Sequence, residues 1–185
     1  TPGLQLLLDA GANPDVGRVS ILCQACEKGQ IDTVRALLDS DADIEYGGTS
    51  SGEKLSEKVA PLFSAMNGGH LDVAALLLER GATMQPGLEY NFSGKPDSDL
   101  AIARLLVEHG WKPTEPHPDS IALLPNVCGV KDYTPVVRYL LSLGCDPNQR
   151  SELTGESGLA AAIKAGQTET ARILLEAGAD PSTAV

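Results

Sequence analysis

Pairs of aliphatic residues recur along the chain, and each pair is followed by two variable residues and then by a residue that ends a helix. The phrase occurs six times, at Leu7–Gly11, Leu37–Asp41, Leu77–Gly81, Leu106–Gly110, Leu140–Gly144 and Leu174–Gly178. Glycine readily adopts the left-handed conformation that closes the last turn of a helix, and aspartate adopts it at a higher cost. The pattern therefore predicts six helix ends of one design, spaced 29 to 40 residues apart.

A shorter apolar stretch precedes the clear copies of this phrase, most plainly at residues 60–70. Leu62, Ala65 and Met66 share one helical face, and Pro61 suits a first helical turn, where its missing N–H is no loss. Each unit is therefore predicted to contain an inner helix followed by an antiparallel outer helix. Because helices this short cannot bury their apolar faces alone, we expect the pairs to stack on one another, with small residues where helices approach closely.

Three units share a more specific pattern. The clearest reads Ala-Pro-Leu-Phe-x-Ala-Met-x-x-Gly-His over residues 60–70, and residues 20–38 and 157–181 repeat it with substitutions. It resembles the pattern of the ankyrin-repeat family, which begins Thr-Pro-Leu-His, and residues 11–14 and 144–148 resemble the start of that family's hairpin loop. The resemblance implies an all-α fold, namely an ankyrin-repeat solenoid of stacked helix-turn-helix units with short hairpin loops.

The motifs predict one domain over residues 1–185, with about five units and an N-terminal half unit. The approximate boundaries are 1–15 (partial), 16–45, 46–85 with an inserted loop at 46–58, 86–114 (degenerate), 115–149 and 150–185. Gly94 and Pro96 interrupt the expected inner helix of the degenerate unit, and Pro125 predicts a kink or an offset helix start in the next. Repeat arrays usually have polar end caps, and the pattern predicts no polar capping helix at either end of this chain. We therefore expect the chain to be a fragment of a longer protein.

Composition narrows the function classes. Lys and Arg number 14 and Asp and Glu 25, and the net charge of −11 argues against nucleic acid and anionic membranes and weakly favours a basic partner. No apolar stretch approaches the roughly 18 residues of a membrane-spanning helix. Four cysteines form neither a dense disulfide framework nor two matched pairs, which indicates a cytoplasmic or otherwise intracellular setting.

Candidate catalytic and metal-binding residues have simpler explanations. Cys23 and Cys26 form a Cys-x-x-Cys, the spacing of half a zinc site or a redox pair, but both fall on core-facing repeat positions and no second pair exists. The three histidines also have structural explanations: His70 lies in a turn, His109 at a helix C-terminus and His117 in a proline-flanked loop. No known catalytic motif is present in the sequence. We therefore predict no catalytic residue, no cofactor and no metal site.

Two features leave alternatives open. The inserted loop at 46–58 is rich in Gly and Ser, so it is either a solvated linker or a finger that extends a binding surface. Trp111 either covers the end of a helix pair or anchors a partner.

In the ankyrin family, hairpin tips and inner helices line a concave groove whose variable positions select a partner. The resemblance implies that the partner-binding positions are Val19, Glu27, Lys28, Val59, Asn67, Gly68, Glu152, Leu153, Glu156, Lys164 and Ala165. A rigid surface of this kind lowers the ordering cost of binding a protein or peptide. We therefore interpret the chain as a protein–protein interaction module, part of a larger intracellular protein. Two alternatives stay open: a stand-alone enzyme with its site in the groove, and a structural spacer or cap for a neighbouring catalytic domain.

Overall fold

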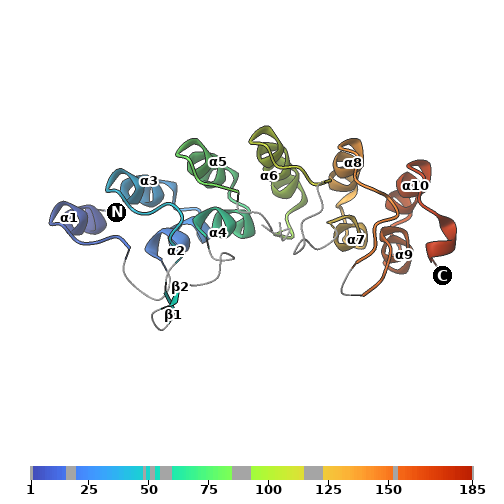
Figure 1. Cartoon of the computed structure of the whole chain (residues 1–185), viewed down its shortest axis with the longest axis horizontal. Helices are drawn as coiled ribbons and strands as arrows, with labels where there is room; N and C mark the ends of the chain where they lie inside the picture. The colour runs from blue at the N-terminus through green and yellow to red at the C-terminus, as the bar shows by residue number, and fades with distance from the viewer. Residues whose placement is uncertain are drawn as a thin grey trace. The chain divides into compact units, whose positions relative to one another are not determined.

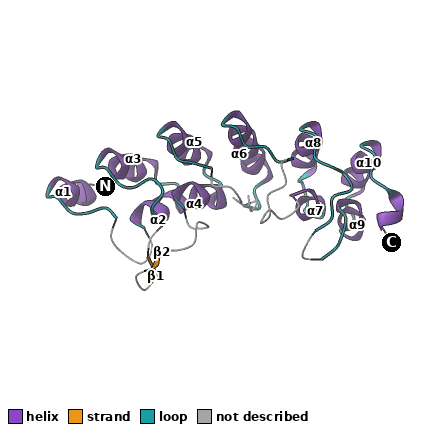
Figure 2. Cartoon of the chain, in the orientation of Figure 1, coloured by secondary structure: helices purple, strands orange, loops and turns teal. Residues whose placement is uncertain are grey.

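Short helices dominate the structure. The computed structural model describes residues 2–15, 20–47, 49–50, 53–54, 60–84, 93–114, 123–151 and 154–184. Within these residues the one strand pair lies in the inserted loop, where β1 (Thr49–Ser50) pairs antiparallel with β2 (Glu53–Lys54) (Figure 2). The chain divides into two compact units, Thr1–His109 and Gly110–Val185, which are described separately.

The first unit contains two layers of helices (Figure 1). The outer layer consists of α1 (Pro2–Asp9), α3 (Ile31–Asp39), α5 (Leu71–Glu79) and α6 (Pro96–Glu108). The inner layer consists of α2 (Ile21–Glu27) and α4 (Pro61–Gly68). α2 packs on α4, each of these helices packs on the outer helix that follows it, and neighbouring outer helices are in contact. The predicted stacking of helix pairs is confirmed in this unit.

The second unit repeats the arrangement with two complete pairs. Its inner helices are α7 (Leu123–Cys128) and α9 (Gly158–Lys164), and its outer helices are α8 (Thr134–Ser142) and α10 (Thr168–Glu176). α7 packs on α9 and α8 on α10. A short 3₁₀ helix, η2 (Pro181–Ala184), follows α10 and contacts α9.

The six predicted helix ends are all left-handed. The φ angles of the stop residues run from 58° at Asp41 to 96° at Gly110. At Gly11 the N–H donates to the Leu8 carbonyl at 2.9 Å, and the next N–H donates to the Leu7 carbonyl at 3.0 Å. The same two bonds occur at the stops in α3, α5, α8 and α10. They satisfy carbonyls that the helix itself leaves open, which is why this phrase ends each helix.

The core follows the repeat pattern. Leu62, Ala65 and Met66 are each at most 2% exposed, as the helical spacing predicts. Full burial of one such aliphatic side chain contributes roughly 1.5–3 kcal/mol. Small residues let the inner helices approach closely, since a Cβ added at Gly158 in α9 would lie 3.0 Å from Cys128 Sγ in α7.

A polar ladder links successive hairpin loops. In each rung, the residue four positions after a stop accepts a hydrogen bond from the backbone N–H two positions after the next stop. The rungs join Asp15 to Asp43, Glu45 to Thr83 and Asn148 to Asp180, at 2.6 to 3.1 Å. Each bond satisfies a loop N–H that the hairpin leaves open, so the ladder fixes the register between repeats.

Two prolines lie in the first turns of helices, and Pro96 belongs to an outer helix, not to the inner helix that it was expected to interrupt, most of which lies outside the described residues. Pro96 is the first residue of α6, where its ring costs no backbone hydrogen bond, and residues 93–95 before it are not helical. Pro125 lies in the first turn of α7, and the residues before Leu123, on which the predicted kink or offset start depends, lie outside the described residues. The approximate unit boundaries and the count of about five units stay predictions.

Candidate partner-binding surface

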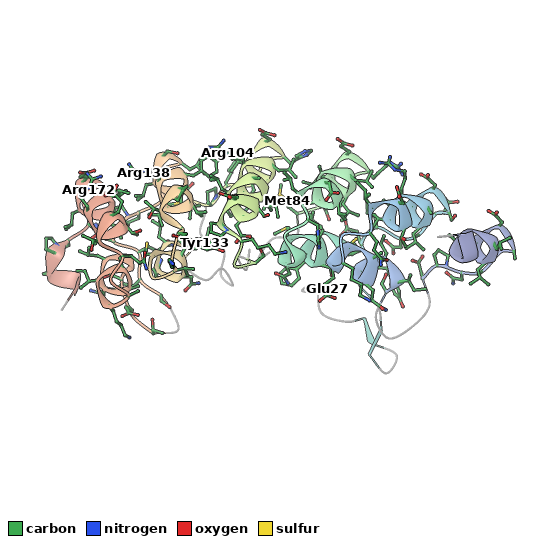
Figure 3. The ribbon with its side chains drawn as sticks, turned by 180° about the vertical axis from the view of Figure 1, so that it is seen from behind. Glu27, Met84, Arg104, Tyr133, Arg138 and Arg172 are labelled. Atoms are coloured by element: carbon green, nitrogen blue, oxygen red, sulfur yellow. The ribbon has the colours of Figure 1, made fainter. Side chains whose placement is uncertain are left out.

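Four predicted partner-binding positions lie together in the first unit. Glu27 ends α2 and Lys28 follows it, while Asn67 and Gly68 end α4. Glu27, Lys28 and Asn67 are exposed and Gly68 is half-buried. Glu27 lies in the inner-helix layer (Figure 3), and because α2 packs on α4 these two helix ends form one surface. We name these four residues the recognition edge.

His70 joins the two halves of the recognition edge. Its Nε2 lies 3.1 Å from the carbonyl oxygen of Glu27, and since a carbonyl only accepts, this bond requires a proton on Nε2. The ring also fills space beside two glycines. A Cβ added at Gly29 would lie 2.4 Å from His70 Nδ1, and one added at Gly68 would lie 2.5 Å from its Cδ2. A contact between repeats therefore fixes the edge.

Lys95 contacts the recognition edge from the next repeat within the first unit, although the repeat pattern does not predict this contact. Its Nζ donates to the Gly68 carbonyl at 2.8 Å. The segment that carries it is held by Asp99, which is fully buried and accepts from the backbone N–H of Ser93 at 3.0 Å and from its Oγ at 2.8 Å. The sequence signal is Pro96, because a helix that starts there places Lys95 at its N-cap.

In the second unit the structure brings together Glu156 and Lys164. Lys164 Nζ lies 3.6 Å from Glu156 Oε1, and the lysine side chain is 80% exposed. Ala165, the residue after α9, is also exposed. The ion pair is long and solvated, so both groups are accessible to a partner. The remaining predicted positions, Val19, Val59, Glu152 and Leu153, lie outside the described residues.

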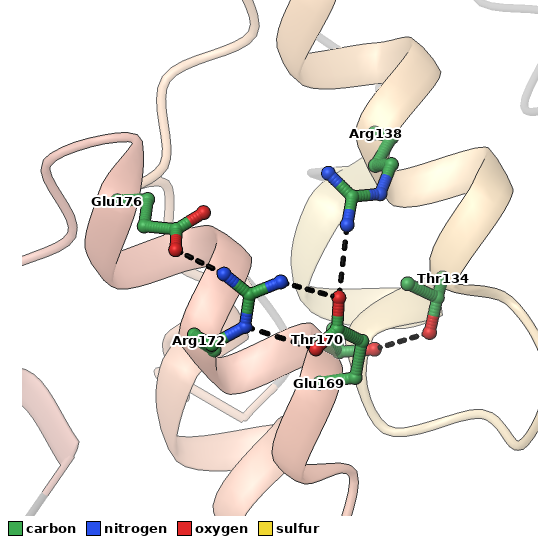
Figure 4. A network of polar contacts seen from close by, with 6 residues as sticks. All are labelled: Thr134, Arg138, Glu169, Thr170, Arg172 and Glu176. Atoms are coloured by element: carbon green, nitrogen blue, oxygen red, sulfur yellow. Dashed lines mark hydrogen bonds and ion pairs between the residues drawn. The ribbon is translucent and has the colours of Figure 1, made fainter.

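The outer layer of the second unit is occupied by internal ion pairs (Figure 4). Arg138 of α8 donates to Glu169 of α10 at 2.9 Å, and Arg172 binds both Glu169 and Glu176. The hydrogen bond from Arg172 is the main cause that lowers the pKa of Glu169. These charges bind one another at 2.9 Å or less, whereas the ion pair at the end of α9 is longer, at 3.6 Å.

The four cysteines are buried free thiols. Cys23 and Cys26 are at most 1% exposed, as the packing interpretation predicts. Burial raises the pKa of Cys23 and of Cys145 to about 11 and that of Cys128 to about 12, and it also raises the pKa of Cys26. Reactive cysteines need the opposite shift. The thiols therefore serve as apolar packing groups.

Carboxylates occupy every second position from Asp39 to Glu45, and those described next bind separate partners. Asp39 pairs with Arg80 at 2.9 Å, Asp43 accepts from the backbone N–H of Glu45 at 2.9 Å, and Glu45 accepts from Thr83. Across the part of the chain that the structure describes, no group of three His, Cys, Asp or Glu side chains could hold a metal ion.

The described histidines lie on separate elements. His70 precedes α5 and His109 follows α6, while His117 lies outside the described residues. Trp111, beyond His109, is half-buried, so its two interpretations stay open. None of the helices in the described ranges is long and apolar enough to cross a membrane.

Comparisons with known proteins agree with this architecture. A family model described as ankyrin repeats (3 copies) matches residues 2–87. Ankyrin repeat and KH domain-containing protein mask-1 of Caenorhabditis elegans is 28% identical over 172 residues, which is 92% of this chain and 6% of that protein. Ankyrin repeat protein nuc-2 of Neurospora crassa is 29% identical over 191 residues, covering 97% of this chain and 16% of that protein. The chain thus spans a small part of the length of these relatives.

The fold defines a class of protein, a stack of helix-turn-helix repeats whose helices end in left-handed residues. Residues 2–87 match the ankyrin-repeat family model, and over most of its length the chain is similar to ankyrin repeat proteins. Ankyrin repeats generally mediate protein–protein interaction and are generally not enzymes.

Proposed function

We propose that this chain binds a protein or peptide partner through the ends of its inner helices and the adjoining hairpin loops. The observation that carries the proposal is the recognition edge, where Glu27, Lys28 and Asn67 are exposed and held in register by the bond between His70 and Glu27. Such a surface is ordered before binding, so a partner gains its contacts without the cost of ordering these groups.

The setting of the interaction is part of the proposal. The net charge of −11 favours long-range attraction of a basic partner over nucleic acid. The buried free thiols support a cytoplasmic or otherwise intracellular location, where thiols stay reduced. The two relatives are ankyrin repeat proteins much longer than this chain, which supports a binding role within a longer polypeptide.

The test is a selection of random displayed peptides on the chain, followed by binding measurements on two variants. Glu27→Arg with Asn67→Arg changes the recognition edge. Ala75→Arg with Glu79→Arg makes the same change in net charge on the outer helix α5, where residue 75 occupies a repeat position that is Arg35 in α3 and Arg104 in α6. We expect the first variant to lose about tenfold or more in affinity and the second to stay within about twofold of wild type. Equal losses, or no selected peptide, would count against the proposal.

A further inference from the structure

Lys95 has a defined position, and within the described part of the chain one hydrogen bond of its ammonium is accounted for. One of its three N–H groups is held by the Gly68 carbonyl at 2.8 Å, and its side chain is exposed. Among the described residues no carboxylate lies within ion-pair distance of it, although Asp97 follows two residues later and Glu27 lies across the His70 bridge. Within these residues the ammonium therefore keeps donors for a ligand at a position that the protein determines.

The segment around Lys95 is anchored from the protein interior. Asp99 is fully buried in the first turns of α6 and accepts two hydrogen bonds from Ser93, the residue two positions before Lys95. The segment also lies against Gly69, where an added Cβ would be 3.0 Å from Ser93 Oγ and 3.2 Å from Lys95 Cδ. Anchoring on both sides limits the entropy that Lys95 would lose on binding.

Lys95 and His70 make equivalent contacts, each with the carbonyl of the last residue of an inner helix. His70 stands at the N-cap of α5 and contacts the last carbonyl of α2, while Lys95 stands at the N-cap of α6 and caps the last residue of α4. The imidazole is half-buried, whereas the ammonium is exposed and carries a full charge. At the end of α4 an ammonium thus takes the place of the imidazole, and Gly68, whose carbonyl it contacts, carries no side chain that could cover it.

We propose that Lys95, together with the neighbouring amide of Asn67, binds a carboxylate of the partner, an aspartate or glutamate side chain of a peptide segment. This inference rests on the proposed function and adds a specificity-determining residue to it. It is compatible with a partner of basic net charge, because long-range attraction depends on the whole −11 charge while this contact is local.

A double-mutant cycle tests the contact. The probes are the peptides enriched by the selection described above, each paired with a copy in which Asp and Glu are replaced by Asn and Gln, and binding is measured by fluorescence anisotropy. On the wild-type chain we expect the acidic form to bind about tenfold more tightly than its amide copy. Lys95→Met should reduce that ratio to below about twofold, Lys95→Arg should restore it, and the control Lys112→Met should leave it unchanged.

The cycle separates recognition from a purely structural cap. If Lys95 only stabilises α4, Lys95→Met lowers the melting temperature and weakens both peptide forms equally, which overturns the inference. Enriched peptides without any acidic residue also overturn it. If the Glu27→Arg, Asn67→Arg variant still binds as wild type, the proposed function fails first. If that variant loses binding and the cycle shows no coupling, only the carboxylate contact is rejected.

Discussion

The turn between inner and outer helices differs between the two units in what surrounds its glycine. Gly29 in the first unit and Gly166 in the second occupy the same repeat position and have nearly equal φ angles of 64° and 70°. The His70 ring occupies the space beside Gly29, whereas an added Cβ at Gly166 would meet nothing within 4 Å. Both turns thus require a residue that adopts the left-handed backbone conformation. The turn at Gly29 also lacks room for a side chain, because His70 of the next repeat lies beside it.

The outer layers show a different contrast. Arg80 pairs with Asp39 in the first unit, while in the second Arg138, Glu169 and Arg172 form a network beside a hydroxyl contact between Thr134 and Thr170 (Figure 4). Apolar stacking is common to both units, so the polar contacts are what distinguish them. In the first unit one ion pair joins two outer helices and a separate contact, from His70 to Glu27, holds the recognition edge, whereas in the second the polar network lies on the outer helices.

Replacing Gly29 by alanine should cause the largest loss of stability. A Cβ in the left-handed region costs about 1–2 kcal/mol, and the methyl group would also displace the His70 ring from its bond to Glu27. We expect the free energy of unfolding to fall by about 2–4 kcal/mol, measured by urea denaturation with circular dichroism.

Gly166→Ala is the matched control, because it introduces the same backbone strain in open space. It should cost only about 1–2 kcal/mol. Hydrogen exchange would show whether each loss stays in its own unit, since repeats can unfold separately. Equal losses in the two variants would mean that the His70 contact adds nothing to the strain.

The sequence predicted those features that depend on neighbouring residues. Helix ends were found because a left-handed stop is a local requirement, whereas the positions of the recognition edge came from the resemblance to the ankyrin family and stay a prediction. The bond from His70 to Glu27 could not be derived, since it joins residues 43 positions apart. Lys95 was missed for another reason: Gly94 and Pro96 disturb the register of the degenerate unit, so no repeat position could be assigned to it.

The thiols allow a third comparison of the units, through their ionisation. Because burial raises their pKa above the ordinary value of 9, to about 11 for both Cys23 and Cys145, the folded chain keeps protons that the unfolded chain releases. The resulting stability is present below pH 9 and is lost as the pH rises from about 9 towards 11. At pH 8 the two thiols should have thiolate fractions about 100-fold below those of the unfolded chain.

Labelling with a disulfide reagent at pH 8 measures this protection, and mass spectrometry of each cysteine assigns it to a unit. Native thiols should react slowly and urea-unfolded thiols quickly. Labelling of the first unit ahead of the second would identify the unit that opens more readily. Native rates equal to the unfolded rates would contradict the burial that raises the pKa.

The hydroxyl contact in the second unit should give an asymmetric pair of variants. Thr170 is 1% exposed and Thr134 is half-buried, and their Oγ1 atoms lie 3.0 Å apart. Thr134→Val leaves the Thr170 hydroxyl buried without its partner, which should cost about 1–2 kcal/mol in urea denaturation. Thr170→Val removes the buried hydroxyl itself and should cost less than about 1 kcal/mol, since Val73 already occupies this repeat position in α5. A larger loss of stability in Thr170→Val than in Thr134→Val would show that the hydrogen bond to Thr134 is not what stabilises the buried Thr170 hydroxyl.

Arg138→Met should have the smallest effect. Arg138 is 54% exposed and Glu169 51%, and an ion pair between solvated groups adds little to stability. We expect the melting temperature to fall by less than about 2 °C in low salt and the difference to disappear in 1 M NaCl, where the Debye length is about 3 Å. Arg35→Met is the control, because Arg35 occupies the same repeat position in α3 and has no ion pair within the described residues. A larger loss that persists in high salt would mean that the Arg138 side chain stabilises the outer layer by packing on α10 and not by its charge.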